Sequence, residues 1–116
     1  MSKEQSVDPT YHPIAEESTA EIERWRTIGE EMILTPFPHH VDIELSTGCN
    51  LRCPKCALAK YEIPYTEMSP MDFKTIIDEG AAKGLRVIKP HYRGEPLIYE
   101  GFTKLMRYAK QQGIQV

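Results

Sequence analysis

An alternation of strand-like and helix-like patterns over residues 40–116 constrains the fold more than any other feature of the sequence. Residues 41–45 alternate apolar with acidic side chains, which is the pattern of a half-buried strand. Apolar residues then recur at helical spacing in two later segments. The expected elements, in order, are a strand at 40–46, a helix at 69–84, a strand at 85–92, a helix at 99–113 and the start of a third strand at 114–116.

This order of elements predicts the fold class. Strands that alternate with helices pair in parallel through right-handed crossovers, so we expect an α/β fold with a parallel βαβαβ arrangement. A parallel sheet is normally covered by helices, and three strands make a poor finished sheet. We therefore expect residues 41–116 to be the N-terminal portion of a larger core domain, truncated here.

Capping residues mark the ends of the expected helices. Ser69 is a good N-cap, Pro70 suits the first helical position, and Gly84 suits the helix stop. Gly113 marks the end of the later helix in the same way. Ladder pairing of the second strand should stop just before Pro90, because proline has no N–H to donate. The residues predicted to face the core from the two helices are Phe73, Ile76, Ile77, Gly80, Ala81, Phe102, Leu105, Met106 and Ala109.

The N-terminal part of the chain divides into two segments. Residues 1–15 are polar and contain two prolines, so we expect a flexible arm. Residues 16–40 are expected to hold a helix at 18–33 and then a proline-rich turn. Ser18, followed three residues later by a glutamate, forms a capping-box pattern. An apolar stripe that includes Trp25 is expected to pack in a core.

All three cysteines of the chain, Cys49, Cys53 and Cys56, lie within one short segment. An odd number cannot pair completely as disulfides, and the first residues lack the apolar core of a signal peptide. No apolar run approaches the roughly 20 residues that span a bilayer. We therefore expect a cytoplasmic protein, in which clustered cysteines usually mean metal binding or catalysis. The net charge of −3, with scattered basic residues, argues against nucleic acid or a membrane as partner.

Three clustered thiolates point to a metal centre. They can hold three irons of a 4Fe–4S cluster and leave the fourth iron open to a small molecule. Thiolates also suit zinc, which would recruit a fourth ligand from His39, His40 or His91. The spacing favours the cluster and leaves zinc open as an alternative. Three unligated, buried cysteines are the least expected reading, because Gly48 and Pro54 shape this segment as a loop.

The cysteine loop follows the first strand, and the segment Arg-Gly-Glu-Pro at 93–96 follows the second strand. Parallel strands end at the same edge of a sheet, and α/β proteins bind ligands at the carboxyl ends of their strands. We therefore expect the two loops to form one site. His91 and Tyr92 should lie beside it, with a structural role for the histidine.

The segment Cys49-Asn50-Leu51-Arg52-Cys53-Pro54-Lys55-Cys56 resembles the CxxxCxxC signature of the radical S-adenosylmethionine (radical SAM) enzymes. The resemblance covers about residues 41–116 and is similar to the SPASM-type peptide and protein modifiers. It implies a partial (βα)6 TIM-like barrel, of which this chain would hold the first units. It also implies a 4Fe–4S cluster on the three cysteines and S-adenosylmethionine, which is cleaved to a 5′-deoxyadenosyl radical that abstracts hydrogen from substrate.

The resemblance implies that four further residues bind S-adenosylmethionine. Gly94 and Glu95 match the end of the GGE motif, which holds the methionine amino group, and Arg93 stands where the first glycine is usual. Lys55 occupies an often aromatic position that packs beside the adenine.

The resemblance also implies partners. These are an electron donor such as a flavodoxin or ferredoxin, a peptide or protein substrate, and a chain that supplies the rest of the barrel. Without the later strands we expect the 116-residue chain not to act as an enzyme alone. The alternative function is a non-catalytic module that binds zinc or an iron–sulfur cluster together with a protein partner.

Overall fold

The structure is a computed structural model that describes residues 15–116, with side chains from residue 19 onward. The described residues fall into two units, residues 15–34 and residues 35–116. Nearly all of the arm predicted for residues 1–15 lies outside the described part of the chain. No helix among the described residues has the length and apolar character needed to cross a membrane.

The first unit is built around helix α1, which spans Ala15–Glu30 and so starts and ends earlier than predicted. Ser18 therefore lies inside the helix and is not its N-cap. The chain leaves the helix through Met32, whose φ of 54° is left-handed. Trp25 is 56% exposed, so its predicted core position is wrong within this unit. The physical reason is that residues 15–34 contain no second element to cover the apolar stripe of a single helix.

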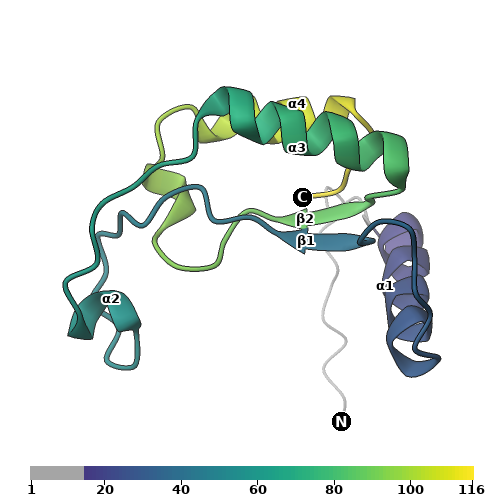
Figure 1. The fold of residues 1–116 in the computed structure, drawn as a ribbon, viewed down its shortest axis with the longest axis horizontal. Coiled ribbons are helices and arrows are strands. Elements are labelled where there is room, and N and C mark those ends of the chain that lie inside the picture. The colour runs from purple at the N-terminus through teal and green to yellow at the C-terminus, as the bar shows by residue number, and fades with distance from the viewer. Residues whose placement is uncertain (1–14) are drawn as a thin grey trace, which may run out of the picture. The chain divides into compact units, whose positions relative to one another are not determined.

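The second unit contains a small parallel sheet (Figure 1). Strand β1 (His40–Asp42) pairs with strand β2 (Val87–Lys89), and Val41 lies opposite Ile88. Gln115 forms an isolated parallel bridge with Val87, with the Gln115 carbonyl accepting from the Ile88 N–H at 2.9 Å. The predicted parallel arrangement is confirmed, and the expected third strand is present as this single bridge.

Both strands are shorter than the sequence predicts, for two different reasons. Strand β2 ends at Lys89, directly before Pro90, because proline has no N–H to continue the ladder. Strand β1 ends at Asp42, and only the Ile43 N–H still reaches the Lys89 carbonyl, at 2.9 Å. Beyond it, the Leu45 carbonyl accepts from the Met68 N–H at 2.8 Å, so the chain has turned to a different partner.

Of the two main helices of this unit, α3 has its predicted caps and α4 is shorter than predicted. Helix α3 spans Pro70–Lys83, and the Ser69 hydroxyl accepts from the Asp72 N–H at 3.0 Å. Gly84, with φ of 104°, ends the helix as predicted. Helix α4 (Phe102–Gln111) begins later than predicted, because a separate 3-10 helix, η1 (Pro96–Ile98), precedes it.

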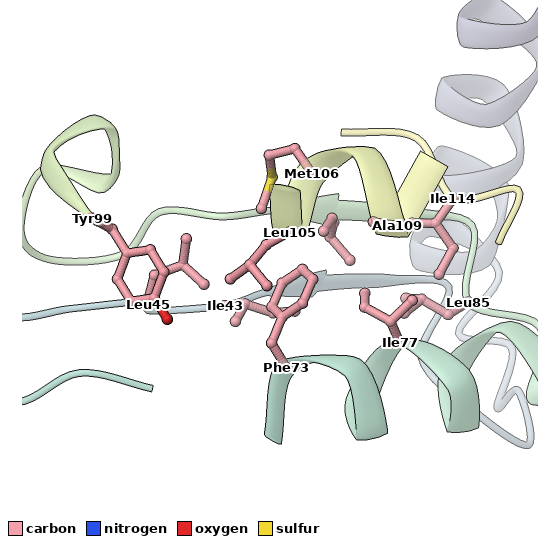
Figure 2. Packing of buried hydrophobic residues seen from close by; sticks show 11 residues of the cluster. Ile43, Leu45, Phe73, Ile77, Leu85, Tyr99, Leu105, Met106, Ala109 and Ile114 are labelled. Atoms are coloured by element: carbon pink, nitrogen blue, oxygen red, sulfur yellow. The ribbon is translucent and has the colours of Figure 1, made fainter. Parts of the chain in front are cut away.

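Helices α3 and α4 lie together on one face of the sheet (Figure 1). The hydrophobic core fills the space between these two helices and the sheet (Figure 2). Phe73 and Ile77 of α3 are completely buried, and each contributes about 1.5–3 kcal/mol through the apolar surface removed from water. The buried core residues are Ile43, Leu45, Phe73, Ile77, Leu85, Ile88, Tyr99, Leu105, Met106, Ala109 and Ile114.

Charged side chains mark the other face of the sheet, because successive residues of a strand point to opposite faces. Asp42 forms an ion pair with Lys89 at 2.7 Å, and its carboxylate lies 3.2 Å from His40 Nε2. The hydrogen bond from Lys89 lowers the pKa of the Asp42 carboxyl. Glu44 is the next residue on this face along the same extended segment. One face is thus apolar and covered by helices, while the other is charged, as in the wall of a small barrel.

Candidate functional site

The loops that follow β1 and β2 meet, as the sequence predicts. The Glu95 N–H donates to the Gly48 carbonyl at 2.8 Å. Gly94 has a φ of 73°, and a Cβ at this position would lie 2.3 Å from the Ser46 carbonyl oxygen. The backbone of the Arg-Gly-Glu-Pro segment therefore packs directly on the root of the cysteine loop.

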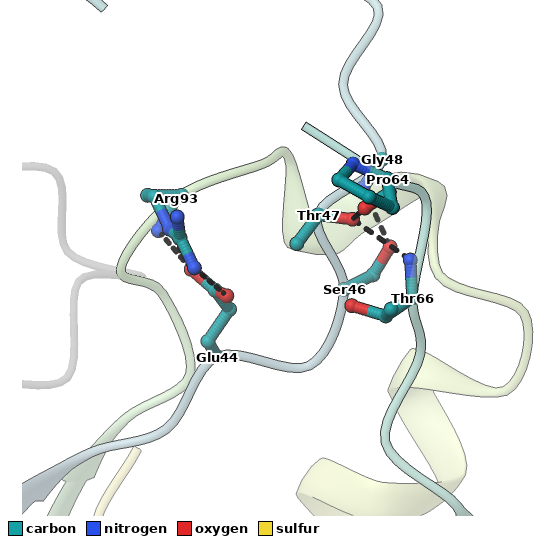
Figure 3. Close-up of polar contacts among 7 residues, drawn as sticks. All are labelled: Glu44, Ser46, Thr47, Gly48, Pro64, Thr66 and Arg93. Atoms are coloured by element: carbon teal, nitrogen blue, oxygen red, sulfur yellow. Dashed lines mark hydrogen bonds and ion pairs between the residues drawn. The ribbon is translucent and has the colours of Figure 1, made fainter. Parts of the chain in front are cut away.

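A short antiparallel contact closes the base of the cysteine loop. Ser46 bridges to Glu67, and the Thr47 N–H donates to the Thr66 carbonyl at 3.0 Å. The Thr47 hydroxyl accepts from the Thr66 N–H at 2.8 Å and donates to the Pro64 carbonyl at 2.9 Å (Figure 3). These contacts join the two ends of the loop.

The Tyr65 side chain packs against the start of the cysteine loop. A Cβ on Gly48 would lie 2.7 Å from Tyr65 Cε2, so a larger residue there would have to displace the Tyr65 ring, which is 66% exposed. The Tyr65 hydroxyl donates to the Glu67 carboxylate, and this hydrogen bond raises the pKa of Tyr65.

The three cysteines lie on the loop between β1 and helix α2 (Ala57–Lys60), with Cys56 directly before α2, which lies away from the sheet in Figure 1. Cys49 and Cys56 are half-buried, Cys53 is exposed, and all three thiols are free. The Cys56 N–H donates to the Cys53 carbonyl at 3.0 Å, and the Leu51 N–H donates to Cys49 Sγ at 3.4 Å. The single turn of α2 directly after Cys56 was not predicted.

The described residues contain no group of three or more His, Cys, Asp or Glu side chains placed to hold a metal ion. The structure therefore brings the cysteines onto one loop but does not gather their sulfur atoms, and His39, His40 and His91 do not complete a zinc site with them. The donor set still fits a cluster, since three free thiols sit on one loop that is anchored only at its base. Ligand loops of this kind commonly close when the metal binds.

The Arg93 side chain lies on Glu44 (Figure 3). Arg93 Nε and Nη2 donate to the two carboxylate oxygens at 2.9 and 3.0 Å, and the Arg93 N–H donates to Oε2 at 2.9 Å. The Arg93 side chain lowers the pKa of Glu44, and burial opposes that shift. Glu44 in turn raises the pKa of Arg93 through the same hydrogen bonds.

The other predicted site residues differ in their surroundings. Glu95 is half-buried, and one of its carboxylate oxygens accepts from the Leu97 N–H at 3.0 Å, which caps η1. Lys55 is exposed at the far end of the cysteine loop, and Tyr92 is also exposed. Glu44 was not among the predicted site residues, because its alternation with apolar neighbours marks only a solvent-facing strand position.

Comparison with known proteins agrees with this arrangement, although no family model matches the chain. Over 84 residues, or 72% of this chain, it is 32% identical to an AdoMet-dependent heme synthase of Methanosarcina barkeri (strain Fusaro / DSM 804).

Two solved structures share the fold. BtrN in complex with AdoMet and 2-DOIA matches 69% of this chain with a TM-score of 0.60 and 19% identity. Streptococcus suis SuiB bound to S-adenosylmethionine matches 84% of this chain with a TM-score of 0.59 and 23% identity.

The fold and the position of the cysteine loop define a barrel-type α/β protein with a loop site at the carboxyl ends of its strands. The matched proteins are radical SAM enzymes, so the chain resembles the radical SAM superfamily in sequence and has the fold of the start of its barrel. The resemblance predicted from the cysteine motif is confirmed. The chain spans 24% of the heme synthase, 33% of BtrN and 23% of SuiB.

Proposed function

We propose that this chain contributes the cluster-binding part of a radical SAM enzyme, with Cys49, Cys53 and Cys56 as the ligands of a 4Fe–4S cluster. The observation that carries the proposal is the contact between the two loops, in which Gly94 packs on Ser46 and Gly48. The contact fixes the Arg-Gly-Glu-Pro segment at the base of the loop that carries the three thiols of the chain. When bound, a three-thiolate cluster supplies the electron that cleaves S-adenosylmethionine to methionine and a 5′-deoxyadenosyl radical.

The residues of the second loop would hold the amino-acid end of S-adenosylmethionine. An ammonium group needs acceptors, and the Gly94 carbonyl and the Glu95 carboxylate are acceptors in adjacent positions. One Glu95 oxygen caps η1, and the other makes no bond within the described part of the chain. Lys55, at the exposed end of the cysteine loop, would contribute its backbone beside the adenine.

Further strands are proposed to complete the site. The chain spans a third or less of the radical SAM proteins that it matches. Within the described residues β1 has a strand neighbour on one side only, and Gln115 forms a single bridge. The missing wall would come from a longer form of this protein or from a partner chain, and the ribose and adenine would contact it. We propose a cytoplasmic setting, a flavodoxin- or ferredoxin-like electron donor, and a peptide or protein substrate.

Anaerobic reconstitution with iron and sulfide tests the metal assignment. The expected product is one 4Fe–4S cluster per chain, measured as iron, sulfide and the absorption of the cluster. Cys53→Ala should abolish stable assembly, because one iron would then lack its thiolate. Asn50→Ala, in the same exposed loop, is the matched control and should assemble normally. A chain purified with zinc and without sulfide, or full cluster content in Cys53→Ala, would overturn the proposal in favour of a structural metal module.

A further inference from the structure

We propose that Glu44 and Arg93 form a positioning pair that sets where Gly94 and Glu95 lie, and thereby the affinity of the site for the amino-acid end of S-adenosylmethionine. The inference rests on the proposed function, because it concerns the same site. In this inference Glu44 and Arg93 act by positioning Gly94 and Glu95, in place of the direct cofactor contact that the resemblance implies for Arg93.

The contacts of Glu44 show that its carboxylate is committed to one partner. It accepts three hydrogen bonds from Arg93, at 2.9, 2.9 and 3.0 Å, which engage both carboxylate oxygens. The Glu44 side chain is 22% exposed and the Arg93 side chain 40% exposed, so water competes only in part. A bidentate arginine–carboxylate pair fixes orientation as well as distance, which a single lysine–carboxylate contact would not.

The pair lies just beyond the point where ladder hydrogen bonding between the two strand segments ends. The last ladder contact is the bond from the Ile43 N–H to the Lys89 carbonyl. Pro90 has no N–H, and the N–H groups of His91 and Tyr92 make no hydrogen bond within the described residues. Arg93 is therefore the first residue after β2 that ties the loop back to the strand-one segment.

The next two residues depend on this attachment. Gly94 follows Arg93 directly, and its backbone lies so close to the Ser46 carbonyl that no Cβ fits. The Glu95 N–H then donates to the Gly48 carbonyl at 2.8 Å. Three consecutive residues of one loop thus contact the segment from Glu44 to Gly48, and Arg93 makes the only one of these contacts that involves charge.

The pair can be tested with Glu44→Gln, which keeps the shape of the side chain and removes its charge. Amide hydrogen exchange on the 116-residue chain should show faster exchange of the Glu95 N–H. With the cluster loaded, the dissociation constant for S-adenosylmethionine should rise about tenfold, the lower end of the effect of a lost charged hydrogen bond. Iron and sulfide content should stay unchanged, and Arg93→Lys should retain part of the affinity.

Two further variants sharpen the test. The double variant Glu44→Gln, Arg93→Lys should bind S-adenosylmethionine no more than about threefold more weakly than the weaker-binding single variant. The reason is that substitutions of two residues in contact do not have additive effects. Glu79→Gln removes the exposed ion pair between Glu79 and Lys83 on α3, at 2.6 Å, and should change neither exchange at Glu95 nor affinity.

Each contrary result has a distinct meaning. Unchanged exchange of the Glu95 N–H in Glu44→Gln would show that the pair does not hold the loop. Faster exchange with unchanged affinity would show a structural role only and would overturn the positioning role. A wild-type chain that takes up no cluster would overturn the proposed function and the cofactor part of this inference, while the exchange data would still decide whether the pair holds the loop.

Discussion

The backbone of Gly94 decides how closely the two site loops approach each other. A Cβ at this position would lie 2.3 Å from the Ser46 carbonyl oxygen and 2.7 Å from the Gly48 carbonyl oxygen. Both obstacles are backbone atoms, which cannot move aside as a flexible side chain can. The φ of 73° would also strain any residue other than glycine. A side chain here would therefore separate the Gly94–Glu95 segment from the cysteine loop.

The Glu44–Arg93 pair makes the stability of the chain depend on pH in a predictable direction. The Arg93 hydrogen bonds lower the pKa of Glu44 below its ordinary value. A carboxyl whose pKa is lowered by folding stabilises the native state fully above its unfolded pKa of about 4.3. That contribution is lost as the pH falls through the lower folded pKa. Acid should therefore weaken the attachment of the second loop.

Urea unfolding at a series of pH values, from about 6 to about 3, measures this effect. The free energy of unfolding of the wild type should fall more steeply over this range than that of Glu44→Gln. At neutral pH, Glu44→Gln should be less stable by about 1–2 kcal/mol, at the low end for a charged hydrogen bond because Arg93 is partly solvated. If the free energies of unfolding of the two proteins changed in parallel with pH, Glu44 would not have a pKa lowered by Arg93.

At the scale of the elements, helix α3 approaches the start of the second strand through Gly80. A Cβ on Gly80 would lie 2.5 Å from Leu85 Cδ2 and 3.0 Å from Leu85 Cβ. Leu85 is only 1% exposed, so its side chain has no free space to move into. Close contact between helix and sheet therefore requires glycine inside this helix, although glycine costs about 1 kcal/mol of helix propensity.

Gly80→Ala should destabilise the chain by about 1–3 kcal/mol, because the cost of overpacking exceeds the gain in helix propensity. Thermal unfolding followed by circular dichroism measures the change. Gly29→Ala in α1 is the matched control, since nothing lies within 4 Å of a Cβ there and its φ is not left-handed. That control should not lower stability. A Gly80→Ala protein as stable as the wild type would show that α3 does not pack at this distance.

The order of the elements and the caps of α3 could be predicted from the sequence, because both depend on local patterns. Ser69 and Gly84 bound α3 through hydrogen bonds to their near neighbours in the chain. Helix α2 could not be predicted, since four residues carry no periodic pattern. The strand ends were only partly predictable, because β1 ends where its backbone turns to the segment around Met68.

The site was predicted as a meeting of two loops, and its internal contacts were not. The spacing of the cysteines and the position of Gly94 and Glu95 after the second strand are visible in the chain. The bond between Glu44 and Arg93 joins residues that are 49 positions apart, and no local pattern identifies such partners. The sequence therefore predicted that Arg93 belongs to the site, whereas its contact with Glu44 is seen only in the structure.

At the scale of the whole molecule, residues 35–116 present apolar surface and unpaired strand edges. Six large apolar side chains in the segments that follow β1 and β2 are about half exposed or more. They are Leu51, Tyr61, Tyr65, Tyr92, Leu97 and Ile98. Within the described residues, β1 pairs with one strand only, so one of its edges has no strand partner. Apolar patches of more than a few hundred Å² and free strand edges both favour association.

We therefore predict that the 116-residue chain self-associates, and that a chain carrying further barrel strands would suppress this association. Sedimentation velocity over a range of protein concentrations measures it, with the sedimentation coefficient expected to rise with concentration. A compact monomer at every concentration would contradict the proposal that the fold is completed by further strands, and would instead agree with a self-contained metal module.

The central claim is that the cysteine loop and the Gly94–Glu95 segment form one site for the cluster and S-adenosylmethionine. Electron–nuclear double resonance tests it most directly, using the reduced, cluster-loaded chain and S-adenosylmethionine labelled in its amino nitrogen. We predict coupling between the labelled nitrogen and the cluster, and weaker binding in Glu95→Gln, which keeps the Leu97 hydrogen bond but removes the charge. A fully loaded cluster that shows no such coupling at saturating S-adenosylmethionine would contradict the account.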